Sequence, residues 1–370
     1  MFGLRQKSAA PSQVKISVCV PVYNTEETLG RALDSIVQAA QGFDGWEILA
    51  ANDGSPGRDA DGRNCKKIVR RFIKENGLSK KQVIYIEHKS NLGLLEARRT
   101  LVQAARGDFV AMLDSDDQLL PGALETLWKA AQESGADIIH AAAIASAGGG
   151  AVGEPSADGK PDAADKNSAA DERAKKRAAE VEQKANNIFL GALCGPDILD
   201  GFLTKKNHSG FLWAKLIRRS TYLAALERIP FSRLVFAEDF LQYFFISRAA
   251  KKYFGISAPV YRYAADTGIS SLKKIASLER WEQVCSAANV FAIIFSDLKE
   301  SLSSGDGADG ALSLEQMEAL RFLSRSYLAN NLKQMEEQVA PQLQEAARAM
   351  LCDYWGEDFV QLIDKNRSRR

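Results

Sequence analysis

The sequence predicts an α/β protein with a mostly parallel sheet flanked by helices, followed by a helical extension at the C-terminus. Residues 14–145 alternate short apolar runs with segments of helical periodicity, which is typical of a parallel sheet covered on both faces. Beyond residue 271 the apolar spacing is that of amphipathic helices. Hydrophobic residues make up 46% of the 370 positions, enough for a large buried core.

Five predicted strands and the helices between them follow in order along the first part of the chain. The strands are rich in β-branched and other apolar residues and are expected at residues 14–22, 46–51, 83–87, 109–113 and 137–141. Apolar side chains recur on one helical face at residues 29–40, 65–73 and 94–105, and Pro121 opens a fourth helix.

Residues 148–187 differ in composition from the rest, because they hold a glycine triplet, many alanines and no aromatic side chain. We expect an exposed insertion, a passive loop rather than a lid, whose second half at 169–184 can form a solvated helix. The expected division is an N-terminal tail at 1–13, a ligand-binding half at 14–147, the insertion at 148–187, a second, well-packed half at 188–271 and a helical region at 272–370.

Charge and apolar runs restrict the partners and the location of the protein. The 48 basic and 47 acidic side chains nearly cancel, which argues against a nucleic-acid partner. No run reaches the roughly 20 apolar residues of a transmembrane segment, and the start lacks the apolar core of a signal peptide. We therefore expect a cytoplasmic protein, with peripheral contact at the inner face of the membrane through the basic tail at 365–370 as the alternative.

Polar side chains follow each of the first four predicted strands, at the point where the strand ends. The four polar segments are residues 21–24, 52–55, 91–98 and 114–117. Ligands of open α/β sheets bind at the carboxyl ends of the strands. Any one segment is compatible with ordinary turn chemistry, but four at one edge predict a binding site.

Three carboxylates after the fourth strand, Asp114, Asp116 and Asp117, indicate a cation. Like charges this close repel one another, and hard oxygen ligands suit Mn²⁺ or Mg²⁺ bound together with substrate phosphates. A solvated turn before Pro121 is the alternative. The apolar strand in front of the cluster favours the metal.

Three more side chains at this edge suit a nucleotide diphosphate. Asp53 is placed to accept a hydrogen bond from an imide N–H such as that of uracil, and Tyr23 offers a ring for base stacking. Arg98 is placed to contact a diphosphate through charge-assisted hydrogen bonds. Together with the carboxylates they predict a site for a nucleotide diphosphate and a metal ion.

In this order the motifs resemble the family-two glycosyltransferases with the GT-A fold. The matching segments are I-S-V-C-V-P-V-Y-N ending at Asn24, E-I-L-A-A-N-D-G-S ending at Ser55, N-L-G with A-R ending at Arg98, and M-L-D-S-D-D ending at Asp117. The resemblance covers residues 14–145 strongly and 205–271 more loosely. Asn52 departs from it, because the family often has Asp there.

The resemblance implies roles for individual residues. Pro21, Tyr23 and Asp53 would line the nucleoside pocket, while Asp114 and Asp116 would bind ribose and the metal diphosphate, with Asp117 an adjacent metal candidate. The full set of expected nucleotide-binding residues is Pro21, Tyr23, Asn24, Asp53, Gly54, Ser55, Asn91, Gly93, Arg98, Asp114, Ser115 and Asp116.

An E-D pair in the second half resembles the family's catalytic pair. It implies Asp239 as the general base, with Glu238 the alternative, because an acceptor hydroxyl must lose its proton as it attacks. A segment containing Trp213 and Lys215 resembles one that leads into the acceptor or diphosphate region, although Trp213 in the core and Lys215 on the surface are the structural alternatives.

The function implied is transfer of one sugar from a nucleotide diphosphate sugar, a UDP-sugar, to an acceptor hydroxyl with inversion, assisted by Mn²⁺ or Mg²⁺. The acceptor stays open among a glycan, a lipid-linked molecule and a protein, the context implied is cell-surface polysaccharide biosynthesis, and the C-terminal helices can form a homo-oligomer. The alternative is a catalytically silent nucleotide-sugar-binding or scaffold protein. A phosphatase of the haloacid dehalogenase type is disfavoured, since Gln118 stands where that motif has Thr or Val.

Overall fold

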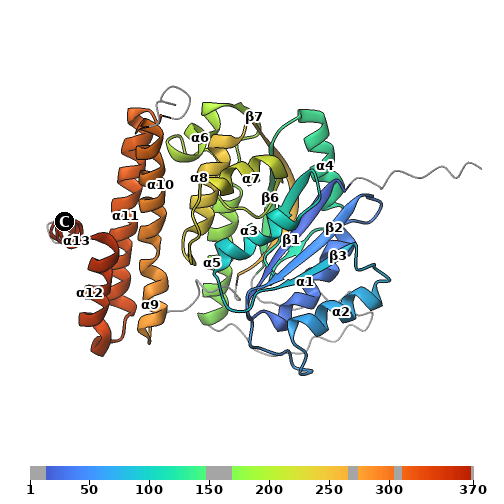
Figure 1. Cartoon of the computed structure of the whole chain (residues 1–370), viewed down its shortest axis with the longest axis horizontal. Helices are drawn as coiled ribbons and strands as arrows, with labels where there is room; N and C mark the ends of the chain where they lie inside the picture. The colour runs from blue at the N-terminus through green and yellow to red at the C-terminus, as the bar shows by residue number, and fades with distance from the viewer. Residues whose placement is uncertain (1–13, 147–168, 266–273, 304–310, 368–370) are drawn as a thin grey trace, which may run out of the picture.

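A computed structural model describes residues 14–146, 169–265, 274–303 and 311–367 (Figure 1). The predicted N-terminal tail, the first part of the insertion and the last three residues of the basic tail lie outside these ranges. The C-terminal helices lie next to the α/β part of the chain (Figure 1).

The described residues form one nine-stranded sheet in the order β3-β2-β1-β4-β8-β6-β9-β5, with β7 also paired to β9. Four parallel strands begin it, namely β1 (Ile16–Val22), β2 (Trp46–Asn52), β3 (Val83–Glu87) and β4 (Phe109–Met112). The rest are β5 (Gln118–Leu119), β6 (Ile138–Ser146), β7 (Gly191–Cys194), β8 (Lys215–Arg218) and β9 (Lys252–Ala264). Strand β8 runs antiparallel to both neighbours, β4 and β6, and strands β5 and β7 run antiparallel to β9. The sheet is therefore mixed, with six strands in one direction and three in the other.

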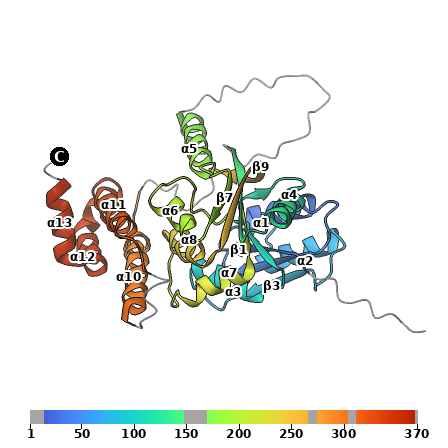
Figure 2. The same cartoon turned by 90° about the horizontal axis from the view of Figure 1, so that it is seen from above.

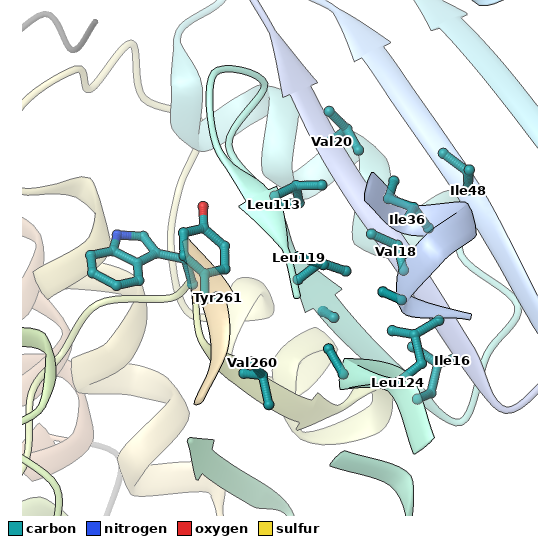
Figure 3. Packing of buried hydrophobic residues seen from close by; sticks show 14 of the residues in the cluster. Ile16, Val18, Val20, Ile36, Ile48, Leu113, Leu119, Leu124, Val260 and Tyr261 are labelled. Atoms are coloured by element: carbon teal, nitrogen blue, oxygen red, sulfur yellow. The ribbon is translucent and has the colours of Figure 1, made fainter. Parts of the chain in front are cut away.

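Alternate residues of β1 supply two separate cores, one on each face of the sheet. Val18 and Val20 pack with Ile36 and Leu113 on one face (Figure 3), and Cys19 belongs to the core on the other face. Period-two alternation of this kind explains why central strands are continuous apolar runs in the sequence.

Helices cover both faces of the sheet. The first core includes side chains of α1 (Glu26–Ala39), α2 (Cys65–Glu75) and α4 (Ala123–Ser134). The second includes those of α3 (Leu94–Ala104), α6 (Pro196–Leu203), α7 (Arg219–Glu227) and α8 (Glu238–Ala249). The helices predicted between the early strands are confirmed, and the fourth begins two residues after Pro121.

The helix expected in the insertion is present as α5 (Ala169–Ala185), but its C-terminal part is not solvated. The Glu182 carboxylate accepts a hydrogen bond of 2.7 Å from the Ala145 N–H, and the Asn186 amide exchanges two of 2.8 Å with the backbone of Ala143. Ala178 and Ala185 are buried. The helix is therefore docked on β6, where Glu182 and the adjacent Asn186 bind backbone groups. Figure 2 shows α5 beside the strands of the α/β part.

The C-terminal region consists of helices that build a third core. They are α9 (Leu278–Cys285), α10 (Ala287–Ser303), α11 (Leu314–Gln338), a short 3₁₀ turn at Pro341–Leu343, α12 (Gln344–Trp355) and α13 (Glu357–Arg367). Fully buried Trp281 anchors this core and donates a hydrogen bond of 2.8 Å to the Ala347 carbonyl. Phe291 of α10 contacts Phe240 of α8, with ring centroids 5.9 Å apart. Among the described residues, no helix is both long and apolar enough to span a membrane.

Candidate active site

Hydrogen bonds tie together the loops that follow β1 and β2. The Asn24 N–H donates to the Ser55 hydroxyl at 3.0 Å, and the Ser55 N–H donates to the Asn52 side-chain oxygen at 3.1 Å. Asn52, the departure from the family pattern, thus closes the turn that presents Ser55. Tyr23 is 40% exposed beside this turn, whereas Pro21 is buried within β1.

Asp53 is buried and fastens β2 to the loop that precedes α3. One carboxylate oxygen, Oδ1, accepts hydrogen bonds from His88 Nδ1 at 2.7 Å and from the Leu92 N–H at 2.9 Å. The other oxygen, Oδ2, accepts one from the Gly93 N–H at 2.8 Å. A carboxylate has about four acceptor positions, so one is left for the predicted imide contact. His88, which sequence reasoning missed, is the residue directly after β3.

Two glycines let these loops approach each other. Gly54 and Gly93 have φ angles of +75° and +97°. A Cβ atom on Gly54 would lie 2.8 Å from the carbonyl carbon of Ser90 and 2.9 Å from the backbone nitrogen of exposed Asn91. Residues 54 and 93 therefore serve the site through their backbone conformation.

The D-S-D-D turn after β4 separates its three carboxylates. Asp117 is buried and accepts hydrogen bonds of 2.7 Å from both the Tyr261 hydroxyl and the Ala264 N–H. Burial raises its pKa well above the ordinary range, and the charges of Asp116 and Asp114 add to this shift. Asp117 is thus held by β9, while Asp114 and Asp116 keep partly exposed positions.

The start of α1 holds the same turn from the other side. The hydroxyls of Thr25 and Ser115 lie 2.7 Å apart, and the Thr28 hydroxyl donates to the Ser115 carbonyl at 2.9 Å. Arg31 adds a bond of 3.4 Å to the Asp116 carbonyl. Ser115, predicted to contact nucleotide, is instead buried and fixes the turn. Sequence reasoning did not identify Thr25, Thr28 and Arg31 as site residues. Their position at the start of the helix that follows β1 is the signal that could have identified them.

Arg98 joins the two halves of the fold. Its guanidinium is buried and donates from Nη1 to Glu238 Oε1 at 2.7 Å and from Nη2 to Asp114 Oδ1 at 3.2 Å. Both terminal nitrogens of the guanidinium thus contact carboxylates, and the diphosphate contact of Arg98 stays a prediction. These pairs place the E-D segment next to the D-S-D-D turn. Glu238 is 140 residues away from Arg98 in the sequence.

Glu238 and Asp239 begin α8 and differ in their partners. Burial, followed by the charge of Asp239, raises the pKa of Glu238 to about 7, and Arg98 opposes this shift. Burial also raises the pKa of Asp239, again opposed by Arg98. Asp239 Oδ1 accepts a hydrogen bond of 2.8 Å from the Phe240 N–H. The two carboxylates thus lie together, but Glu238 alone is paired directly with Arg98.

Trp213 and Lys215 are core residues. The Trp213 ring stacks on Tyr261 with centroids 5.0 Å apart and is only 6% exposed. Lys215 is 1% exposed, and its Nζ donates to the Phe211 carbonyl at 2.5 Å and lies 5.1 Å from the Tyr243 ring centroid. Burial lowers the pKa of this amine to about 7. The surface alternative for Lys215 is wrong, because β8 lies in the middle of the sheet, covered on both faces.

Within the described residues, no group of three or more His, Cys, Asp or Glu side chains is arranged to hold a metal ion. Asp114 and Asp116 nevertheless offer two hard, partly exposed carboxylates on one short turn. Such a pair fits a divalent cation that takes its remaining ligands from substrate phosphates and water.

The chain is similar to known glycosyltransferases. Residues 17–178 match the model of glycosyl transferase family 2. Over 124 residues, 34% of this chain, the sequence is 40% identical to glycosyltransferase GlyA of Streptococcus pneumoniae and 30% identical to an uncharacterized glycosyltransferase, EpsJ, of Bacillus subtilis. A poly(ribitol-phosphate) beta-glucosyltransferase of Bacillus spizizenii is 29% identical over 126 residues. These matches span only 16%, 32% and 18% of the respective relatives.

Among solved structures, Staphylococcus aureus TarS 1-349 in complex with UDP-GlcNAc aligns with a TM-score of 0.51 at 18% identity. The alignment covers 96% of this chain and 93% of that one, and at this identity it shows the fold alone. Residues 17–178 therefore resemble glycosyl transferase family 2, and the fold is of the GT-A type.

Proposed function

We propose that the chain transfers one sugar from a UDP-sugar to an acceptor hydroxyl with inversion at the anomeric carbon. The observation that carries this proposal is the Arg98 bridge, since it brings a donor-side carboxylate, Asp114, beside the Glu238-Asp239 pair. The UDP-GlcNAc complex of TarS supports a UDP-sugar as the donor class.

Asp114 and Asp116 are the residues proposed to hold Mn²⁺ or Mg²⁺ on the donor side. When bound, a divalent cation supplies Lewis-acid stabilisation of the charge that develops on the departing nucleoside diphosphate. Asp117 is not needed as a ligand, because Tyr261 and Ala264 already occupy its oxygens. Its buried carboxylate instead fixes the turn that presents the other two.

Asp239 is the proposed general base. Glu238 is engaged by Arg98, whereas Asp239 Oδ2 has no hydrogen bond within the described residues. Oδ2 takes the proton of the acceptor hydroxyl while the hydroxyl oxygen attacks the anomeric carbon and the diphosphate oxygen leaves from the opposite side. This single displacement inverts the centre, and positioned bases contribute about 10²–10⁴-fold to such rates.

The acceptor proposed is a hydroxyl of a cell-surface polysaccharide or of its lipid-linked precursor. The Bacillus spizizenii relative, a poly(ribitol-phosphate) beta-glucosyltransferase, supports this class of acceptor. Asp239 lies next to Glu238, which Arg98 joins to Asp114, and polar groups of this kind suit a polyhydroxylated acceptor.

Calorimetry with UDP, in the presence and absence of MnCl₂, tests the donor side of this proposal. We expect Mn²⁺ to strengthen UDP binding and Asp116→Ala to remove that gain. Asp108→Ala, which changes a carboxylate before β4, is the control. Equal Mn²⁺ dependence in the wild type and in Asp116→Ala would remove Asp116 from the metal site. Absence of UDP-sugar hydrolysis and transfer across a donor panel would favour a silent binding protein.

A further inference from the structure

Arg98 holds its two carboxylate partners unequally. The bond to Glu238 is 2.7 Å long and reaches a side chain that is 9% exposed, while the bond to Asp114 is 3.2 Å long and reaches one that is 27% exposed. A shorter and more buried ion pair is the harder one to open. Asp114 is therefore the partner that can turn toward a ligand while the guanidinium stays on Glu238.

Other contacts fix Glu238 in place. The Gln242 side-chain amide donates to the Glu238 carbonyl at 3.0 Å, and the Tyr222 hydroxyl donates to Gln242 Oε1 at 2.6 Å. Gln242 is fully buried. The start of α8 is thus anchored independently of Arg98, so Glu238 holds the guanidinium from a fixed position, through an ion pair of 2.7 Å.

We propose that Glu238 is a positioning residue. By holding Arg98, it limits the competition of the guanidinium for the Asp114 carboxylate and so strengthens divalent-cation binding on the donor side. The inference rests on the proposed function, because it requires Asp114 as a metal ligand. Without the anion at 238, Arg98 would pair with Asp114 alone and compete with the cation. The loss of a nearby negative charge would also lower the attraction for the cation, so both effects have the same sign.

Glu238→Gln is the direct test, since it removes the charge and keeps the shape. MnCl₂ is titrated into the full chain at saturating UDP, and binding is followed by calorimetry and by the electron paramagnetic resonance signal of free Mn²⁺. We expect about a tenfold loss of Mn²⁺ affinity, as is typical when a side chain behind a metal ligand is changed. Glu238→Asp, which keeps the charge, is expected to recover most of the affinity.

Glu96→Gln is the matched control. Glu96 is a buried carboxylate of α3 that pairs with Arg99 at 2.9 Å and accepts a bond from the Ser232 N–H, without contact to the D-S-D-D turn. It is expected to change stability but not Mn²⁺ affinity. Wild-type affinity in Glu238→Gln, or equal losses in Glu238→Gln and Glu96→Gln, overturns the inference. Failure of the wild type itself to bind Mn²⁺ with UDP overturns the proposed function as well.

Discussion

The Tyr261 hydroxyl lies between the two ends of the D-S-D-D turn: it donates to Asp117 Oδ2 at 2.7 Å and accepts from the Asp114 N–H at 3.2 Å. One buried hydroxyl of β9 thereby sets the position of the buried Asp117 relative to the partly exposed Asp114. The turn's geometry consequently depends on a strand that follows it by more than a hundred residues.

Tyr261→Phe is predicted to lower the free energy of unfolding by about 1–3 kcal/mol, because it leaves a buried carboxylate short of a donor. The Mn²⁺ dependence of UDP binding should weaken with it. Chemical denaturation and calorimetry measure the two effects. Tyr263→Phe is the matched control, since the Tyr263 ring also stacks on Trp213 while its hydroxyl makes no hydrogen bond within the described residues. Equal behaviour of the two variants would contradict the assignment.

Asp239→Asn is predicted to lower kcat by about 10²–10⁴-fold while UDP affinity stays near the wild-type value. An amide cannot take the acceptor proton, but it keeps the size of the side chain and its contact with the Phe240 N–H. Steady-state transfer kinetics and calorimetry separate the two quantities. Transfer near the wild-type rate would place the base elsewhere.

Lys215 gives the protein a pH dependence of stability that Lys215→Met should remove. Burial lowers the pKa of this amine from its ordinary value of 10.5 to about 7, so the unfolded chain binds more protons between these values. Stability contributed by this site therefore rises as pH increases from about 7 to 10.5, by a few kcal/mol at most. Urea denaturation at about pH 7 and about pH 9.5 measures the slope. If Lys215→Met showed the same pH dependence of stability as the wild type, that dependence would come from other groups.

Gly54→Ala is predicted to cost more stability than Gly42→Ala and to reduce UDP binding. Both glycines have φ near +75°, but a Cβ at Gly42 meets no atom within 4 Å, whereas one at Gly54 collides with the backbone of Ser90. Gly42→Ala should cost about 1 kcal/mol for the conformation alone, and Gly54→Ala roughly 2–3 kcal/mol. Melting temperatures of the two variants compare them, and similar values would argue against the close approach of the loops.

The early strands and the polar edge could be predicted because their signals are local. The apolar run before Asp114, for example, specifies both a buried strand and the position where its polar end emerges. What a carboxylate does at that edge could not be predicted in the same way. Asp53 and Asp117 accept hydrogen bonds from His88 and Tyr261, and only the folded chain brings those donors within reach.

Arg98 and Lys215 show why contacts between the halves escaped prediction. The Arg98 partner Glu238 is 140 residues away, and no periodicity in either segment encodes the pairing. A surface position was one alternative for Lys215, and it is wrong because the short strand β8 lies between β4 and β6, out of sequence order. Burial of that amine follows from topology, which local patterns do not carry.

The docking of α5 has a consequence for the part of β6 that extends beyond β8. Strand β8 pairs with β6 only from Ile138 to His140, so the backbone of Ala143 and Ala145 has no strand partner on that side within the described residues. Unpaired strand edges recruit strands from other molecules. Glu182 and Asn186 occupy those backbone groups with side chains, which cannot extend a ladder. Helix α5 and the adjacent Asn186 thus cover an open edge of β6, and a variant lacking residues 169–187 is expected to aggregate more readily through that edge.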